Sequence, residues 1–150
     1  MRLVVQRVSK AKVMIGGDCY SAIGRGFLVL LGIETEDNTE DVTWLTAKLC
    51  GMRVFADEAG KMNLDLSQAD GEVMVVSQFT LHASTKKGNR PSFTKAARPE
   101  TAIPLYREFI RQMDKTLGKP CATGEFGADM QVELINDGPV TIILDSKNKE

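Results

Sequence analysis

The sequence predicts an α+β fold in which an antiparallel or mixed β-sheet, or a barrel-like core, is packed by two main helices. Runs rich in Val, Ile and Leu open the chain, and similar runs recur in its middle and near its end. Two segments between them have apolar residues at helical spacing. Because short turns join neighbouring strand-like runs, a wholly parallel sheet is not expected. At 150 residues the chain is expected to form a single domain, residues 1–150.

The composition indicates a soluble, cytoplasmic protein without membrane contact. The net charge of −1 gives the molecule no overall field that attracts nucleic acid, so any basic site must be local. Cys19, Cys50 and Cys121 are widely spaced and match no zinc motif, which favours reduced thiols. Charges interrupt the apolar residues at the N-terminus, unlike in a signal peptide, and the longest apolar run, 27–33, is too short to span a bilayer.

Strands are predicted wherever β-branched and aliphatic residues cluster between Gly-containing turns. The predicted strands are 2–8, 11–15, 26–34, the short segment 53–55, and 71–83. The run 26–34 is apolar throughout, so both of its faces are expected to be covered. Residues 57–63 are polar and contain Gly60, which predicts a hairpin-like connection there.

A first helix is predicted after Asn38 or Thr39. Either residue is a suitable N-cap, acidic residues follow in the first turn, and Val42, Leu45 and Leu49 recur at helical spacing.

A second helix is predicted over residues 98–118. Pro104 lies within it, and it either marks the true first turn or costs one hydrogen bond. Gly118 and Pro120 are expected to end this helix. Its apolar face consists of Ala102, Leu105, Tyr106, Phe109, Ile110, Met113 and Leu117.

The segment 133–144 reads as two apolar strands joined at Asp137-Gly138, an ordinary hairpin turn signal. Pro139 follows directly, and its missing N–H cannot join a ladder at the start of the return strand. A cis bond before Pro139 has a base rate of about 5–6%. These residues alone therefore favour a turn. The tail, residues 146–150, is expected to fray.

Few residues suit metal, cofactor or acid–base chemistry. His82 is the only histidine, and no motif for a zinc protease, a phosphate-binding loop or a dinucleotide site is present. No acidic cluster has the spacing of metal ligands. We therefore expect no metal and no cofactor.

The segment 77–82, "SQFTLH", is the first candidate for chemistry. Alternation on a strand places Gln78, Thr80 and His82 on one face. One interpretation is a nucleophile–base pair of Thr80 and His82, although side chains two residues apart on a strand are separated by about 7 Å. The other is a strand end that becomes polar as it leaves the core.

The loop 84–98 is the second candidate. It contains five basic residues, no acidic residue and one aromatic, Phe93. Such a loop suits phosphate contacts and base stacking on single-stranded or terminal RNA, or it is simply solvated. The basic residues are Lys86, Lys87, Arg90, Lys95 and Arg98.

The segment 123–130, "TGEFGADM", is the third candidate. Its glycines permit a close approach of the backbone to a ligand or to another strand. Phe126 and Met130 either line an apolar wall or fill the core.

Several blocks together resemble the D-aminoacyl-tRNA deacylases. The clearest are "SQFTL" (77–81), "KKGNRPSF" (86–93) and "NDGPVT" (136–141). The likeness extends along nearly the whole chain, because "MRLVVQRV", "GKMN" and "TGEFGADM" stand in the family's order.

This resemblance implies an enzyme of translational proofreading. Such an enzyme hydrolyses the ester that joins a D-amino acid to the 3′ end of tRNA, and it also accepts tRNA mischarged with glycine. The resemblance further implies an α+β homodimer with active sites at the subunit interface. The catalytic segment would be Ser77, Gln78, Phe79 and Thr80.

The same resemblance implies a gate against L-amino acids. Gly138 and Pro139, joined by a cis bond, would reach across from the other subunit, with Arg7 supporting them. Phe126 and Met130 would flank the pocket. Contacts to tRNA would come from the basic loop, at Lys86, Lys87 and Arg90. Two alternatives remain open, a non-catalytic module that binds the tRNA end and an ordinary Thr/His esterase.

Overall fold

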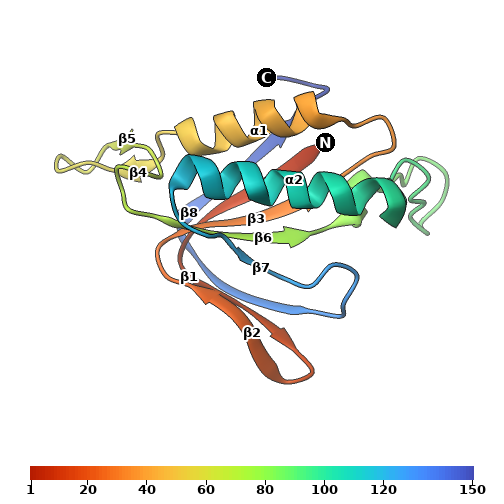
Figure 1. Cartoon of the computed structure of the whole chain (residues 1–150), viewed down its shortest axis with the longest axis horizontal. Coiled ribbons are helices and arrows are strands. Elements are labelled where there is room, and N and C mark those ends of the chain that lie inside the picture. The colour runs from red at the N-terminus through yellow and green to blue at the C-terminus, as the bar shows by residue number, and fades with distance from the viewer.

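A mixed β-sheet curls beneath two helices in the computed structural model, which describes residues 1–150 (Figure 1). The helices α1 (Thr39–Gly51) and α2 (Pro99–Leu117) pack against each other on the same side of the sheet. The predicted α+β class with two main helices is confirmed. Neither helix combines the length and the apolar character that crossing a membrane requires.

The sheet is built around one long strand, β1 (Arg2–Ile15). Two consecutive strands, β2 (Asp18–Ile23) and β3 (Gly26–Gly32), pair antiparallel with successive parts of β1. The last strand, β8 (Gln131–Asp145), pairs antiparallel with the other edge of β1.

Two parallel pairings extend the sheet beyond β3. β6 (Glu72–Ser77) lies parallel to β3, and the short β7 (Ala122–Thr123) lies parallel to β6. The Ser21 hydroxyl on β2 donates to the carbonyl of Thr123 on β7 at 2.6 Å. The sheet therefore curls into a nearly closed barrel. A separate hairpin, β4 (Phe55–Ala56) and β5 (Met62–Leu64), confirms the connection predicted at 57–63 and projects from one end of the molecule (Figure 1).

The N-terminal strands differ from the prediction in two ways. Segments 2–8 and 11–15 form one strand, because the ladder with β8 continues between them through Lys10, which faces Ile135. The strand 18–23 was not predicted, since its mixed composition gives no clear alternation.

The hairpin predicted at Asp137-Gly138 is wrong. Residues 131–145 form one strand, and both of its halves pair with β1 rather than with each other. Gln6 faces Thr141 and Val8 faces Asn136, so four residues, 137–140, bulge out opposite Arg7. The turn signal at Asp137-Gly138 is local, whereas β1, the strand with which this segment pairs instead, lies more than 120 residues away in the sequence.

Both helices have the ends that the sequence suggests. Asn38 is the N-cap of α1, because its side chain accepts from the N–H of Glu40 at 2.8 Å and Asp41 accepts in return from the N–H of Asn38. α2 begins at Pro99, so Pro104 lies in its interior and costs one hydrogen bond. Gly118 ends α2 in the left-handed conformation, with φ of 71°.

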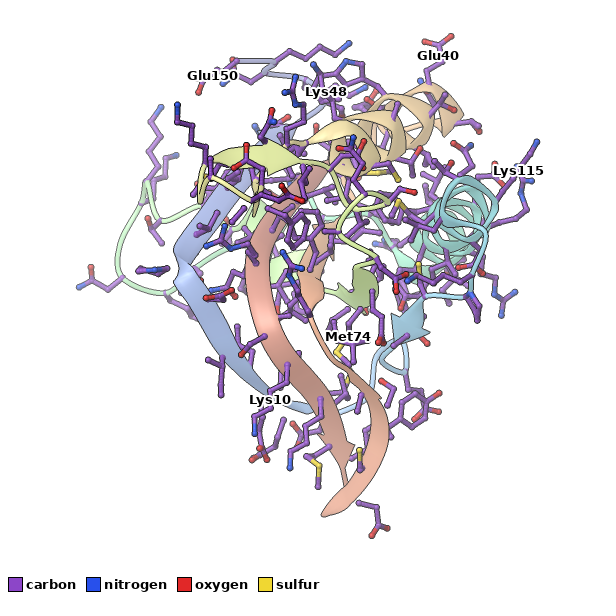
Figure 2. All side chains as sticks on the ribbon, turned by 90° about the vertical axis from the view of Figure 1, so that its left-hand side faces the viewer. Lys10, Glu40, Lys48, Met74, Lys115 and Glu150 are labelled. Atoms are coloured by element: carbon purple, nitrogen blue, oxygen red, sulfur yellow. The ribbon has the colours of Figure 1, made fainter.

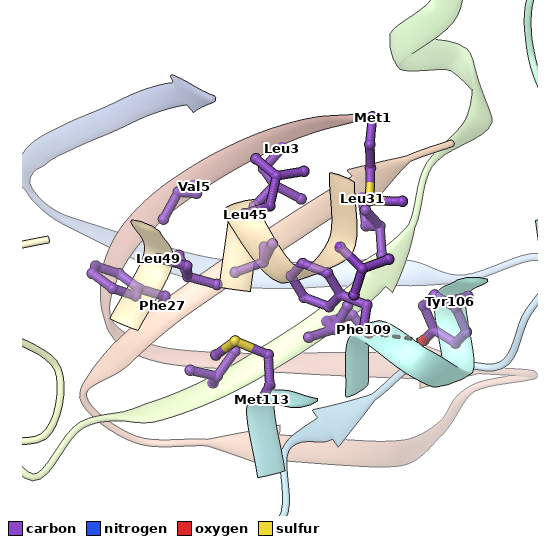
Figure 3. Packing of buried hydrophobic residues seen from close by; sticks show 14 of the residues in the cluster. Met1, Leu3, Val5, Phe27, Leu31, Leu45, Leu49, Tyr106, Phe109 and Met113 are labelled. Carbon is purple, nitrogen blue, oxygen red and sulfur yellow. Dashed lines mark hydrogen bonds between the residues drawn. The ribbon is translucent and has the colours of Figure 1, made fainter. Parts of the chain in front are cut away.

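Two clusters of buried apolar residues form the core. The larger fills the space between the helices and the sheet and includes Phe27, Leu31, Leu45 and Phe109 (Figure 3). The smaller lies inside the curled half of the sheet, around Met74. Charged side chains such as those labelled Glu40 and Lys115 project outward (Figure 2).

The prediction that the C-terminal tail frays is wrong for Ser146 and Lys147. Ser146 is buried and its N–H donates to the carbonyl of Met1 at 3.0 Å. The Lys147 ammonium lies 3.0 Å from the Asp41 carboxylate on α1. These contacts tie the first residues of the tail to the start of β1 and to α1.

Candidate active site

A cavity of about 300 Å³ opens where β6 ends. Ten of its fourteen lining residues are hydrophobic, so it is an apolar recess with a few polar groups. The lining comes from four segments far apart in the sequence, namely Leu31 and Ile33, Val76 to Phe79, Ala97 and Ala102, and residues 126–130 with Val132. This is the concave, mostly apolar form that small-molecule sites usually have.

The predicted strand 71–83 ends at Ser77, and this changes the geometry of the candidate segment. The N–H of Gln78 donates to the carbonyl of Leu31 at 2.8 Å. The chain then turns into a short 3-10 helix, η1 (Phe79–His82). The alternation that placed Gln78, Thr80 and His82 on one strand face is therefore wrong.

The start of η1 presents free backbone donors beside the cavity. Because Phe79 and Thr80 are the first two residues of the helix, their N–H groups have no acceptor within it. Phe79 lines the cavity with Ser77 and Gln78, while Thr80 is exposed just beyond the lining. The Thr80 hydroxyl accepts a hydrogen bond from the Gln78 side-chain amide. This corner of the cavity is suited to holding a negatively charged oxygen.

His82 and Thr80 have different environments. His82 is buried and does not line the cavity, whereas Thr80 is exposed. The Nδ1 atom of His82 lies 3.7 Å from a carboxylate oxygen of Glu34, and its Nε2 atom has no hydrogen-bond partner. These surroundings are those of a packed side chain and not of a base in contact with substrate.

Phe126 and Met130 both line the cavity. The Phe126 ring packs edge-on against Tyr106 of α2, with centroids 5.7 Å apart. The Tyr106 hydroxyl donates to the carbonyl of Val75 at 3.1 Å, and burial raises the pKa of Tyr106 to about 12. A Cβ on Gly124 would lie 2.4 Å from the Met130 sulfur, so the glycine makes room for that side chain.

Gly138 and Pro139 lie in the bulge of β8 and do not line the cavity of their own chain. The bond between them is cis, and both residues are exposed. Arg7 supports the bulge, because its Nε donates to the carbonyl of Asp137 at 2.9 Å and its Nη1 donates to the carbonyl of Val54. The Asn136 side chain closes the bulge by accepting from the N–H of Val140 at 2.8 Å.

The basic loop lies next to the cavity through an aromatic contact. Phe93 packs edge-on against Phe79, with ring centroids 5.1 Å apart, and both rings are partly exposed. Two backbone hydrogen bonds between Ser84 and Ser92 close the loop. Its cations Lys86, Lys87, Arg90, Lys95 and Arg98 are exposed, and none forms a salt bridge.

Some residues of the site could not be identified from the sequence. Ala97 and Ala102 line the cavity from the start of α2, but their small apolar side chains resemble those of any helix. Asn136 closes the bulge through a contact with Val140, and Tyr106 holds the cavity wall through a long-range contact with Val75. Of these residues, only Asn136 could have been noticed in the sequence, because its polar side chain stands next to the Asp137-Gly138 pair.

A family model and several similar proteins indicate one family. The family model described as D-Tyr-tRNA(Tyr) deacylase matches residues 4–145. The D-aminoacyl-tRNA deacylases of Bacteroides thetaiotaomicron and Akkermansia muciniphila are 59% and 61% identical to the chain, and the matches cover 100% of both chains in each pair.

Two solved structures also match. One, described as a c-Myc DNA Unwinding Element Binding Protein, is 44% identical, with a TM-score of 0.91 over 97% of this chain and 98% of the other. Another, a probable eukaryotic D-amino acid tRNA deacylase, is 15% identical, with a TM-score of 0.85 over 95% and 97%, and it shows the fold alone. By its sequence and its fold, the chain belongs to the D-Tyr-tRNA(Tyr) deacylase family.

Proposed function

We propose that the chain hydrolyses the ester between a D-amino acid and the 3′ end of tRNA in the cavity at the end of β6. Membership of the family supports a hydrolase that acts on this ester. The observation that carries the proposal within the structure is the start of η1, where two backbone N–H groups without helical acceptors lie beside an apolar cavity. Because the substrate is tRNA, we place the reaction in the cytoplasm.

The proposed chemistry uses backbone groups and the substrate itself. Water attacks the ester carbonyl carbon, and the N–H groups of Phe79 and Thr80 stabilise the oxyanion that forms. Each such donor contributes about 10²–10³-fold to the rate in comparable sites. The bond to the ribose 3′ oxygen then breaks, and that oxygen takes a proton. The neighbouring 2′-hydroxyl of the ribose helps to activate the water, so no strong protein base is needed.

Selection against L-amino acids is assigned to Gly138 and Pro139 of a second copy. These residues are exposed on a bulge that Arg7 and Asn136 hold in place, and they do not reach the cavity of their own chain. In a homodimer the bulge of one subunit enters the cavity of the other. Its carbonyls grip the substrate amino group, and its backbone blocks the direction of an L side chain. Phe126 and Met130 flank the substrate.

Glycine has no side chain for such a wall to reject. Glycyl-tRNA is therefore expected to be hydrolysed as well, because it presents the same ester and the same amino group. The gate discriminates between enantiomers and does not recognise any particular side chain.

Contacts to tRNA are assigned to Lys86, Lys87 and Arg90. These cations have no acidic partner within the protein, and the loop that carries them lies against Phe79 at the cavity. Phosphates near the acceptor end supply the missing negative charge.

The test is to incubate the purified protein with D-tyrosyl-tRNA and with L-tyrosyl-tRNA and to follow loss of the ester. We expect rapid hydrolysis of the D substrate and little of the L substrate. Equal hydrolysis of both, or none of either, would contradict the proposal, and binding without hydrolysis would indicate a module that only holds the tRNA end.

Two variants separate this proposal from a Thr/His esterase. Thr80→Ala removes the hydroxyl and keeps the N–H, and His82→Ala removes the only imidazole. We expect both variants, assayed well below their melting temperatures, to keep most of the activity. An esterase that uses a Thr80–His82 pair would lose activity in both.

A further inference from the structure

Arg2 contacts the far end of η1. Its Nη1 donates to the carbonyl of Leu81 at 2.7 Å. Its Nε and Nη2 lie 3.0 and 2.9 Å from the same carboxylate oxygen of Asp145. Arg2 begins β1 and Asp145 ends β8, and the two residues face each other in the sheet. The Arg2 guanidinium thus joins the end of β8 to the last turn of η1.

Asp145 is itself held in place, and this fixes the guanidinium. Its other carboxylate oxygen accepts from the N–H groups of Lys147, at 2.9 Å, and Asn148, at 3.3 Å. Burial acts to raise the pKa of Asp145, but the hydrogen bonds from Lys147 and Arg2 and the charge of Arg2 outweigh it and lower the pKa. Asp145 therefore stays ionised at neutral pH beside Arg2.

The rest of η1 is fixed by β3. The N–H of Gln78 donates to the carbonyl of Leu31, immediately before the helix. A Cβ on Gly32 would lie 2.9 Å from the Leu81 Cβ, so Leu81 packs directly on the β3 backbone. β3 therefore holds Leu81 and its neighbours on one side. Arg2 binds the carbonyl of Leu81, which lies near the end of η1 and accepts no hydrogen bond within that helix.

We propose that Arg2 is a positioning residue, oriented by Asp145, which holds η1 so that the N–H groups of Phe79 and Thr80 point at the reacting ester. This inference rests on the proposed function, which assigns those two N–H groups to the oxyanion. Arg2 acts through the backbone of Leu81 and does not contact the substrate. Its loss lets the short helix shift, and a shift of about 1 Å in a catalytic group costs up to about 10²-fold in rate.

The test compares Arg2→Met, Arg2→Lys and Asp145→Asn with the wild type. Arg2→Met keeps the apolar stem and removes the donors, whereas Arg2→Lys keeps the charge but not the fork of donors. Lys12→Met is the matched control, because Lys12 lies on the same strand in an exposed ion pair with Glu133. The kcat and KM for D-tyrosyl-tRNA are measured well below each melting temperature, with amide hydrogen exchange of residues 79–83.

We expect Arg2→Met to lower kcat by about 10- to 100-fold with KM within about twofold, and to speed exchange at the amides of η1. Arg2→Lys and Asp145→Asn should lie between this variant and the wild type, and Lys12→Met should match the wild type. If Arg2→Met does not fold, the other two variants carry the test, and a kcat within about twofold of the wild type in both overturns the inference.

The inference and the proposed function fail in different ways. An active wild type with an equally active Arg2→Met variant overturns the inference alone. A wild type that hydrolyses no D-aminoacyl-tRNA overturns the proposed function and with it the positioning role of Arg2. A rise in KM at unchanged kcat also overturns the inference, because it would place Arg2 in substrate binding.

Discussion

Phe79 begins η1, so its N–H has no acceptor inside that helix, and its ring lies between the cavity and the basic loop. Two substitutions separate the contribution of the Phe79 N–H from that of the Phe79 ring. Phe79→Ala removes the ring and keeps the N–H, whereas Phe79→Pro removes both, and proline is well tolerated at the first position of a helix. We expect Phe79→Pro to hydrolyse D-tyrosyl-tRNA about 10²–10³-fold more slowly than Phe79→Ala in single-turnover assays. Equal rates would show that this N–H does not stabilise the oxyanion.

Gly32 lies where η1 packs closely on β3. A Cβ at this position would lie 2.9 Å from the Leu81 Cβ and 3.1 Å from the carbonyl oxygen of Gln78. Gly32→Ala should therefore push η1 away from β3, lowering the free energy of unfolding by about 1–3 kcal/mol and also lowering kcat. Gly51→Ala is the control, since no atom lies within 4 Å of its Cβ position. Urea denaturation measures the first effect, and a Gly32→Ala variant as stable as Gly51→Ala would contradict it.

At the level of single residues, five of the fourteen residues that line the cavity had been named as site residues from the sequence. They are Ser77, Gln78, Phe79, Phe126 and Met130, and their roles in the reaction stay predictions. The alternation that placed Gln78, Thr80 and His82 on one strand face was wrong, because it assumed that the strand continued past Ser77. Nothing in the residue types of 78–82 marks the change from strand to 3-10 helix, since it depends on the packing of Leu81 on Gly32.

Among the elements, α2 supports the cavity wall through Tyr106. Its buried hydroxyl donates to the carbonyl of Val75 on β6, while its ring packs on Phe126. Tyr106→Phe removes this hydrogen bond, while the N–H of Gly124 still donates to the same carbonyl at 3.2 Å. We therefore expect the free energy of unfolding to fall by about 0.5–1.5 kcal/mol. Tyr20→Phe is the control, because Tyr20 is exposed and a surface change of this kind stays within about 0.5 kcal/mol. Thermal or urea denaturation of both variants checks the difference.

The two helices could be predicted closely because their signals are local. Asn38 and Asp41 form the capping box of α1, Pro99 is the first residue of α2, and Gly118 is the C-cap of α2. Each of these signals acts within one or two turns. β8 could not be predicted in the same way. Its Asp137-Gly138 pair is a strong local turn signal, but pairing along nearly the whole of β1 keeps the strand continuous, so only the four residues 137–140 leave the ladder.

For the whole molecule, the charge distribution predicts how binding responds to salt. The net charge is −1, but Lys86, Lys87 and Arg90 form no salt bridge, and they lie on the loop whose Phe93 contacts Phe79 at the cavity. We expect Lys86→Ala, Lys87→Ala and Arg90→Ala each to raise KM and to reduce the slope of log KM against log salt by about 0.7 for each phosphate that is no longer neutralised. Lys115→Ala is the control, since this side chain projects from α2 (Figure 2). An unchanged slope in all three loop variants would place the tRNA elsewhere.

The fold class follows from local patterns, whereas the closure of the sheet does not. Alternating strand and helix signals are enough for an α+β fold with two helices, but the contact of Ser21 on β2 with Thr123 on β7 joins residues more than 100 positions apart. Assembly is a further step. The proposed function places the exposed bulge at Gly138 and Pro139 in the cavity of a second copy, so we expect sedimentation to report a dimer.

In the proposed homodimer, each site combines the cavity of one subunit with the bulge of the other. Phe79→Pro impairs the cavity, and Gly138→Ala impairs the bulge, because Gly138 has a φ of 134° and a Cβ there would lie 2.9 Å from the Val140 side chain. Co-expression of the two variants with random pairing makes about half of the dimers mixed, each with one intact site of two. We predict that hydrolysis of D-tyrosyl-tRNA, nearly lost in each variant alone, returns to about one quarter of the wild-type rate. No recovery above the separate variants would show that cavity and bulge act within one chain.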